Sequence, residues 1–162
     1  MAGPTAVAQN PCSDNRSGSA SCSITATVSA TVNSELQMTF SLCTSASGSN
    51  CNTTLTAPKA QDFGNASGVS SSGPTLTVKA NTNYTLTAAA ASATWSGGGN
   101  DKPASDLRFS VNGGSFGALS QVGQGAATAG KPYAIGYNTL YNWTIDKPGN
   151  YSLVVNYTLT SP

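Results

Sequence analysis

The stretch from Tyr151 to Thr160 has the clearest alternation of apolar and polar residues in the chain. Its odd-numbered positions are all apolar or aromatic, and its even-numbered positions are polar except for Val154. A period of two is typical of a strand with one buried face in an antiparallel sheet. The preceding Pro148-Gly149-Asn150 predicts a turn, because proline fixes φ and glycine permits positive φ. We therefore predict a long strand that closes a sheet.

Alternating segments of the same kind recur through the rest of the chain. Residues 23–32 and 35–42 both place their apolar side chains at even positions, which fits one bent strand or a hairpin with the loop 33–35. Asn112-Gly113 predicts a tight hairpin turn, and residues 121–130 are predicted to be a Gly/Ala loop. The alanines 88–91 are too few to nucleate a helix, so we assign them to a strand. Strands are predicted near residues 74–80, 84–91, 107–111, 116–119, 133–137 and 143–145.

These segments predict an all-β fold. About eight or nine short strands at this spacing, with no amphipathic helix between them, are typical of an antiparallel β-sandwich or barrel. The length of 162 residues suits one domain with one core. We therefore predict a single β-sandwich domain over residues 23–162, preceded by an N-terminal arm, residues 1–22.

The arm is rich in proline, glycine and serine and has almost no periodicity. It is either a disordered terminus or a segment that adds to the sheet of a neighbouring subunit. Its first residues lack the basic start and apolar centre of a signal peptide. Met1 is then either a cloning start before a mature secreted chain, which the cysteines favour, or the start of a protein that needs no secretion, such as a virion component.

The composition narrows the choice of partners. Charged residues make up 8% of the chain, against roughly 25% in ordinary globular domains. Ser, Thr, Ala, Gly and Asn replace them, and a surface of hydroxyls and amides suits extracellular or assembled proteins. The net charge of +1 and the scattered basic residues give no electrostatic footprint for nucleic acid or an anionic membrane. No apolar run approaches the roughly 20 residues that span a bilayer.

Four cysteines, Cys12, Cys22, Cys43 and Cys51, occur in this Ser/Thr-rich chain. They indicate two disulfides and an oxidising, extracellular compartment. Three connectivities are open, and we favour the local pairs Cys12–Cys22 and Cys43–Cys51, which close two short polar loops. A zinc site is disfavoured, because the chain has no histidine and no Cys-x-x-Cys spacing.

Four segments are similar to one known class of domain: residues 24–32, 62–64, 76–86 and, closest of all, 148–159. They resemble a type of secreted bacterial immunoglobulin-like domain found in surface and fimbria-associated proteins. The resemblance covers about residues 23–160 and leaves out the arm. It implies an immunoglobulin-like β-sandwich and offers no catalytic residue to carry over. The two predicted loop disulfides distinguish the chain from simple pilins.

Few residues offer catalytic or metal-binding chemistry. Without histidine, Ser-His-Asp and Cys-His catalysis are excluded. Asp101 and Asp106 flank Pro103 and form either a weak calcium site or carboxylate pair, or simply a solvated turn. Asp146 is interpreted as part of the turn before the last strand. No phosphate loop or nucleotide fingerprint is present. We therefore expect no enzyme and no cofactor.

Aromatic residues are the candidate ligand surface. Trp95, beside a glycine loop, and Trp143, in a tyrosine-rich stretch, could stack on sugar rings; the alternative is that both belong to the core. Asn15, Asn52 and Asn65 head Asn-x-Ser/Thr sequences in predicted loops and are candidate N-glycosylation sites.

Low charge, loop disulfides and the lack of catalytic groups favour a non-enzymatic extracellular structural protein, a subunit of a surface layer, a pilus-like filament or another shell. We expect it to self-associate or to join a neighbouring surface protein, in part through residues 1–22. One alternative is a carbohydrate-binding, adhesive module that uses Trp95 or Trp143. Another is a viral capsid decoration protein on the virion surface.

Overall fold

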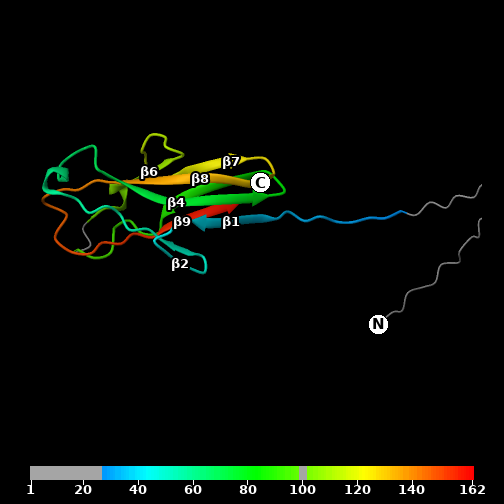
Figure 1. Ribbon diagram of the computed structural model, residues 1–162, viewed down its shortest axis with the longest axis horizontal. Coiled ribbons are helices and arrows are strands. Elements are labelled where there is room, and N and C mark those ends of the chain that lie inside the picture. Colours follow the sequence, from blue (N-terminus) through cyan, green and yellow to red (C-terminus); the bar gives the residue numbers. More distant parts are fainter. Residues whose placement is uncertain (1–26, 99–101) are drawn as a thin grey trace, which may run out of the picture. The chain divides into compact units, whose positions relative to one another are not determined.

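The computed structural model describes residues 27–98 and 102–162 (Figure 1). The chain divides into two compact units, Met1–Asn33 and Ser34–Pro162. The whole predicted arm, residues 1–22 with Cys12, Asn15 and Cys22, belongs to the first unit and lies outside the described residues.

The described part of the first unit, residues 27–33, contains no strand. Its two valines, Val28 and Val32, are 92% and 82% exposed. The sequence predicts that residues 23–32 form part of a bent strand or one strand of a hairpin. For residues 27–32, which the structure describes, this prediction is wrong. The alternation gives the segment the side-chain pattern of a strand, but a strand also needs a hydrogen-bonding neighbour.

The second unit is all-β, as predicted, and its sheets are antiparallel (Figure 1). The first sheet has the order β1-β4-β8-β6 and the second β7-β5-β9, while β2 and β3 form a separate hairpin. Two 3-10 turns, η1 and η2, lie in the connections. The bounds are β1 Leu36–Ser41, β2 Ser45–Ser47, β3 Asn50–Asn52, η1 Ala60–Asp62, β4 Val69–Ala80, β5 Tyr84–Ala90, η2 Ala104–Asp106, β6 Leu107–Val111, β7 Gln121–Gly125, β8 Thr128–Thr139 and β9 Val155–Thr160.

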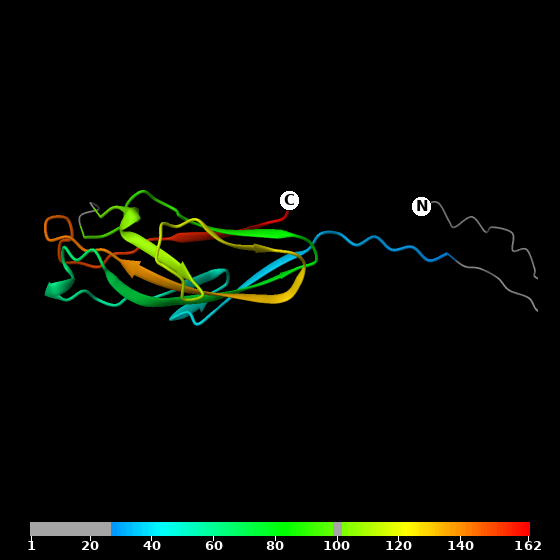
Figure 2. The ribbon, with the colours of Figure 1, turned by 90° about the horizontal axis from the view of Figure 1, so that it is seen from above.

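The two larger sheets face each other and share one hydrophobic core, visible as two layers in Figure 2. Leu76 and Val78 of β4 and Leu86 of β5 are fully buried at its centre. They alternate with threonines that face outward or are only partly covered. This is the pattern expected when apolar side chains at period two are removed from water on one face of a sheet.

Two tyrosine pairs cross the core between the layers. The hydroxyl of Tyr84 in β5 lies 2.9 Å from that of Tyr133 in β8. The hydroxyl of Tyr137 in β8 lies 2.7 Å from that of Tyr157 in β9. Each pair gives a buried hydroxyl the hydrogen-bond partner that it needs away from water.

Several predicted elements are confirmed. From Tyr151 to Thr160 every odd position is partly buried and every even position is exposed, although the hydrogen-bonded strand β9 begins only at Val155. The alanines of 88–90 lie in β5, not in a helix. Asn112 and Gly113 have φ values of 52° and 75°, the positive pair that a type I′ turn requires. The strand predicted near residues 116–119 is wrong: between β6 and β7 only Gly117 is bridged, to Phe109, and the next strand begins at Gln121.

Residues 121–130 are not a loop: they contain β7 and the start of β8. Their glycines make room for aromatic rings. A Cβ added at Gly123 would lie 2.3 Å from Cε1 of Tyr133, and one at Gly125 would lie 3.0 Å from the hydroxyl of Tyr84. Small residues such as these glycines favour a loop prediction. In the structure they are needed because larger side chains would not fit beside the tyrosine rings between the sheets.

Residues 143–145 are not a strand either, because polar side chains fold residues 142–146 into a compact turn. The Asn142 carboxamide oxygen accepts the backbone N–H of Thr144 at 2.9 Å. The Asp146 carboxylate accepts the backbone N–H of Asn142 at 2.6 Å. Such local bonds compete with a sheet ladder. Leu42 also departs from prediction: it is 78% exposed at φ 61° and lies just after the end of β1.

No helix among the described residues is long and apolar enough to cross a membrane.

Candidate functional site

The first candidate site is the place where the outer strands of the two sheets meet. β1 ends the four-stranded sheet, and β9 ends the three-stranded sheet. The rings of Phe40 in β1 and Tyr157 in β9 meet edge to face at 5.9 Å, so the two strands are neighbours across the layers. Within the described part of the chain, β9 is paired in a sheet with β5 alone.

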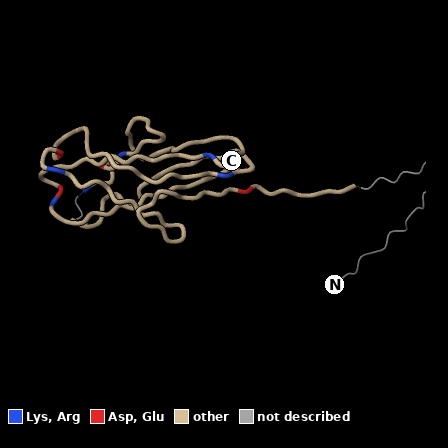
Figure 3. Tube along the Cα trace, viewed as in Figure 1, with Lys and Arg blue, Asp and Glu red and all other residues tan. Residues whose placement is uncertain are grey.

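This boundary has no charged side chain on either strand (Figure 3). Val155, Tyr157 and Leu159 of β9 point toward the core but remain only partly buried. Native proteins usually protect a sheet edge with lysine, proline or a bulge, because its free backbone groups bind other strands. We call the outer side of β9, together with the adjacent β1, the open edge. Its chemistry suits the addition of another strand.

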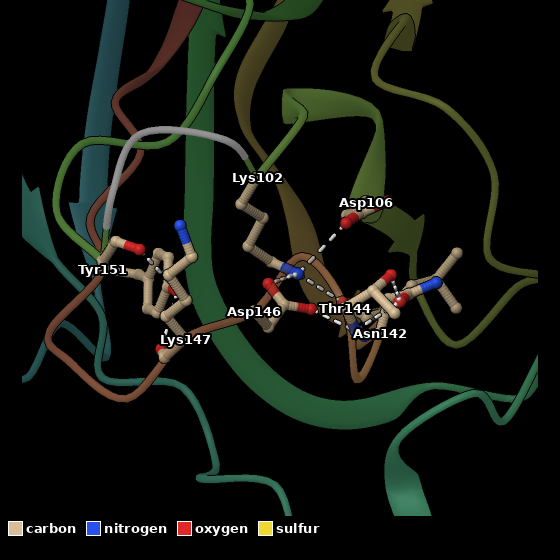
Figure 4. Close-up of polar contacts among 9 residues, drawn as sticks. Lys102, Asp106, Asn142, Thr144, Asp146, Lys147 and Tyr151 are labelled. Carbon is tan, nitrogen blue, oxygen red and sulfur yellow. Dashed lines mark hydrogen bonds and ion pairs between the residues drawn. The ribbon is translucent and has the colours of Figure 1, made fainter.

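A second cluster surrounds Lys102, just before η2 (Figure 4). The Lys102 side chain is 1% exposed, and its Nζ lies 2.9 Å from Asp146 Oδ1 and 3.1 Å from Asp106 Oδ2. Nζ also donates a hydrogen bond to the carbonyl oxygen of Leu140. Asp106 is the last residue of η2, and its backbone oxygen accepts the N–H of Leu140. The turn 142–146 brings Asp146 to the same point.

The cluster is enclosed by aromatic rings. Nζ of Lys102 lies 4.6 Å from the ring centre of Tyr141 and 5.9 Å from that of Trp95, distances at which a cation is attracted to a ring face. Burial, and next the nearby carboxylate of Asp146, raise the pKa of the Tyr141 phenol. One ammonium therefore faces two carboxylates in a site with little water.

The sequence did not identify this cluster. The sequence offers Asp106 with Asp101 as a weak calcium site, a carboxylate pair or a solvated turn, but Asp101 lies outside the described residues and the observed partner of Asp106 is Lys102. The spacing of Lys102 and Asp106, four residues apart, was the available signal. No group of three or more potential metal ligands occurs within residues 27–98 and 102–162.

The two tryptophans have opposite environments. Trp95 is 5% exposed and packs in the core, so its ring faces are covered. Trp143 is 66% exposed. Its ring stacks on Phe63 with centres 4.5 Å apart and planes at 27°, and Phe63 in turn contacts Tyr141. The turn 142–146 thus presents one supported indole ring at the surface.

The remaining predicted residues lie in or near the hairpin and the loop after η1. Cys43 and Cys51 form the predicted disulfide, with Cα atoms 5.4 Å apart. The cysteine loop is a small hairpin, β2–β3, and Asn52 lies in β3, not in a loop. Asn65 lies in the exposed loop after η1. Both asparagines are exposed.

A surface hollow over β4, β6 and β8 has no acid–base group. It is lined by hydroxyls and small residues, among them Ser70, Ser71, Ser110 and Gly136. Such a lining cannot transfer protons in the way that a catalytic site requires. The open edge, the Lys102 cluster and Trp143 are therefore the features from which we argue function. No protein-family model, curated protein or solved structure matches the chain.

Proposed function

We propose that the chain is a non-enzymatic structural subunit of an extracellular assembly, an immunoglobulin-like β-sandwich that builds a surface layer, filament or shell. The observation that carries the proposal is a complementary pair. The first unit contains an exposed alternating segment, residues 27–32, and the second unit has the uncharged open edge. The Cys43–Cys51 disulfide supports an oxidising location. A cell surface is the location we favour, and a virion surface is the alternative.

Residues 27–32 have the properties of a donated strand. Their apolar side chains, Val28, Ala30 and Val32, recur at period two, as do Val155, Tyr157 and Leu159 of β9. The segment and β9 have the same length, six residues. If the segment from one copy pairs with β9 of another, its apolar side chains join the partly buried row beside the core.

The energetics favour this pairing over exposure. Each valine that moves from water into an apolar contact contributes about 1.5–3 kcal/mol. The backbone groups of both strands gain hydrogen-bond partners at the same time. Part of this gain offsets the loss of freedom of the ordered segment, so buried area alone does not set the affinity. The sequence suggested residues 1–22 as the segment that mediates assembly. We propose the alternating residues 27–32 instead.

A charge test distinguishes the two faces of the segment. The double variant Val28→Asp/Val32→Asp places two carboxylates on the face that would be buried. The matched control Ser29→Asp/Thr31→Asp places the same charges on the opposite face. We expect the wild type and the control to form oligomers in light scattering and electron microscopy, and the first variant to be monomeric. Assembly of both variants, or a wild type that is monomeric even at high concentration, would overturn the proposal.

Trp143 supports a second candidate function, a glycan-binding module. Its exposed ring, stacked on Phe63, provides the flat apolar face on which a sugar ring can stack. A polysaccharide panel should then quench or shift the tryptophan fluorescence of the wild type. Trp143→Ala should abolish the response, whereas Trp95→Phe should retain it. A panel without any response would exclude this function.

A further inference from the structure

The contact between Lys102 and Asp146 has an unusual combination of burial and proximity. Nζ lies 2.9 Å from Oδ1, and the two side chains are 1% and 3% exposed. Despite this distance, Oδ1 has no hydrogen bond of acceptable geometry. The contact joins the residue before Pro103 and η2 to the turn before β9 (Figure 4). An amine and a carboxyl group therefore lie in reach of each other at a fixed, water-poor position.

As an ionic cluster this arrangement is costly. Two carboxylates and one ammonium leave a net negative charge among the rings of Tyr141 and Trp95. Desolvation of buried charges often exceeds their mutual attraction. Conversion of one ammonium–carboxylate pair into a neutral amide would remove two of the three charges. The site thus favours condensation over the separated ions.

We propose that Lys102 and Asp146 become joined by an intramolecular amide bond, with Asp106 as the proton carrier. The Lys102 ammonium gives a proton to the Asp106 carboxylate, which passes it to Oδ1 of Asp146, and the neutral amine attacks Cγ of the resulting carboxylic acid. The new bond is Nζ–Cγ, and the bond that breaks is Cγ–Oδ1. Both protons that Nζ loses pass through Asp106 to Oδ1, which leaves as water. Asp106 ends as the carboxylate that it was at the start, and nothing is oxidised or reduced.

The neighbouring backbone is placed to assist this reaction. The N–H of Asn142 donates to Asp146 Oδ2 at 2.6 Å, the oxygen on which negative charge develops when the amine attacks. The carbonyl of Leu140 accepts another proton of Nζ and orients the amine. Asp106 Oδ2, at 3.1 Å from Nζ, is within direct proton-transfer distance. The surrounding rings limit the return of water, which would reverse the condensation.

Intact mass spectrometry of the full chain, after reduction and alkylation of the cysteines, tests the bond directly. We expect the wild type to be lighter than its sequence by one water molecule, and a protease digest to contain a branched peptide joining the segments around Lys102 and Asp146. A wild type at its full sequence mass would overturn the proposal, whatever the variants do.

Three variants assign the roles. Lys102→Arg removes the nucleophilic amine but keeps the positive charge, and we expect the full sequence mass. Asp106→Asn keeps the size of the proton carrier, and we expect the bond to be lost or to form far more slowly. Glu35→Gln removes an exposed carboxylate outside the cluster and should retain the deficit of one water. A complete bond in Asp106→Asn would overturn the role of Asp106. The proposal does not rest on assembly, and these masses are independent of it.

Discussion

The Cys43–Cys51 disulfide closes a hairpin that stands apart from the core, and this sets what its removal should do. All residues of β2 are exposed, and in β3 only Cys51 is partly covered. The two strands pair with each other and with no other strand of the described chain. The perturbation is the double variant Cys43→Ser/Cys51→Ser, which replaces each sulfur with a hydroxyl at positions already rich in polar neighbours.

The size of the effect depends on whether the hairpin stays ordered without the disulfide. For a sequence separation of 8, the chain-entropy model gives at most about 2.5 kcal/mol of stabilisation. The full stabilisation is lost only if the hairpin remains folded in the variant that lacks the disulfide. A ladder of three residue pairs without an apolar cover is marginal alone. Without the disulfide the hairpin should open even in the folded protein, so the folded and unfolded states both gain chain entropy. The loss of global unfolding free energy should therefore be about 1 kcal/mol or less.

Urea unfolding followed by the fluorescence of the buried Trp95 measures the global free energy. Hydrogen exchange at the backbone amide of Thr44, which donates to the carbonyl oxygen of Asn52 at 2.8 Å, measures the opening of the hairpin in the wild type and in the double variant alike. We expect a nearly unchanged unfolding midpoint together with lost protection in the hairpin. Ser47→Ala, which leaves the disulfide intact, should change neither. A global loss near 2.5 kcal/mol, the chain-entropy limit, with a hairpin that remains protected would refute this reasoning.

Three further predictions concern the core. Leu86→Ala, at a side chain with 0% exposure, should cost about 2–5 kcal/mol of unfolding free energy in urea titrations, whereas the exposed Thr87→Ala should cost little. Gly123→Ala should cost about 1–3 kcal/mol in the same assay, because its Cβ would lie 2.3 Å from Cε1 of Tyr133. Burial, and next the hydrogen bond with Tyr133, raise the pKa of Tyr84 from 10.0 to about 12. Its contribution is therefore complete below about pH 10 and is lost as pH rises toward 12, and Tyr84→Phe should flatten unfolding free energy against pH in that window.

The sequence predicted the strands in which apolar and polar side chains alternate in the same way as buried and exposed positions. Leu76 and Val78 alternate with threonines, and the odd positions of the closing strand are apolar, so a local pattern matched the final packing. The sequence does not predict β7, because its glycines make room for tyrosine rings of other strands. A local sequence pattern contains no information about such contacts. The turn 142–146 was missed because hydrogen bonds of Asn142 and Asp146 outweigh the strand preference of the residues between them.

The candidate sites were only partly accessible to the same reasoning. An open, uncharged closing strand could be anticipated, since β9 contains no charged residue and follows the last turn. Which tryptophan is exposed could not, because Trp95 and Trp143 both lie beside polar residues, and only the packing decides between them. The Lys102 cluster joins Lys102 to the carbonyl of Leu140, 38 positions further along the chain, and such a meeting depends on the whole fold.

The two tyrosine pairs have a mechanical consequence. Apolar contacts between layers are non-directional and let one sheet slide over the other at little cost, whereas an O–H···O bond tolerates little displacement. Both pairs start from β8, at Tyr133 and Tyr137, and reach β5 and β9. One such hydrogen bond would still let one sheet rotate about it, but two separate hydrogen bonds restrict rotation as well as sliding of the sheets. Under a pulling force we expect the layers to keep their alignment, so that the body yields by peeling a strand from an edge and not by shear between its sheets.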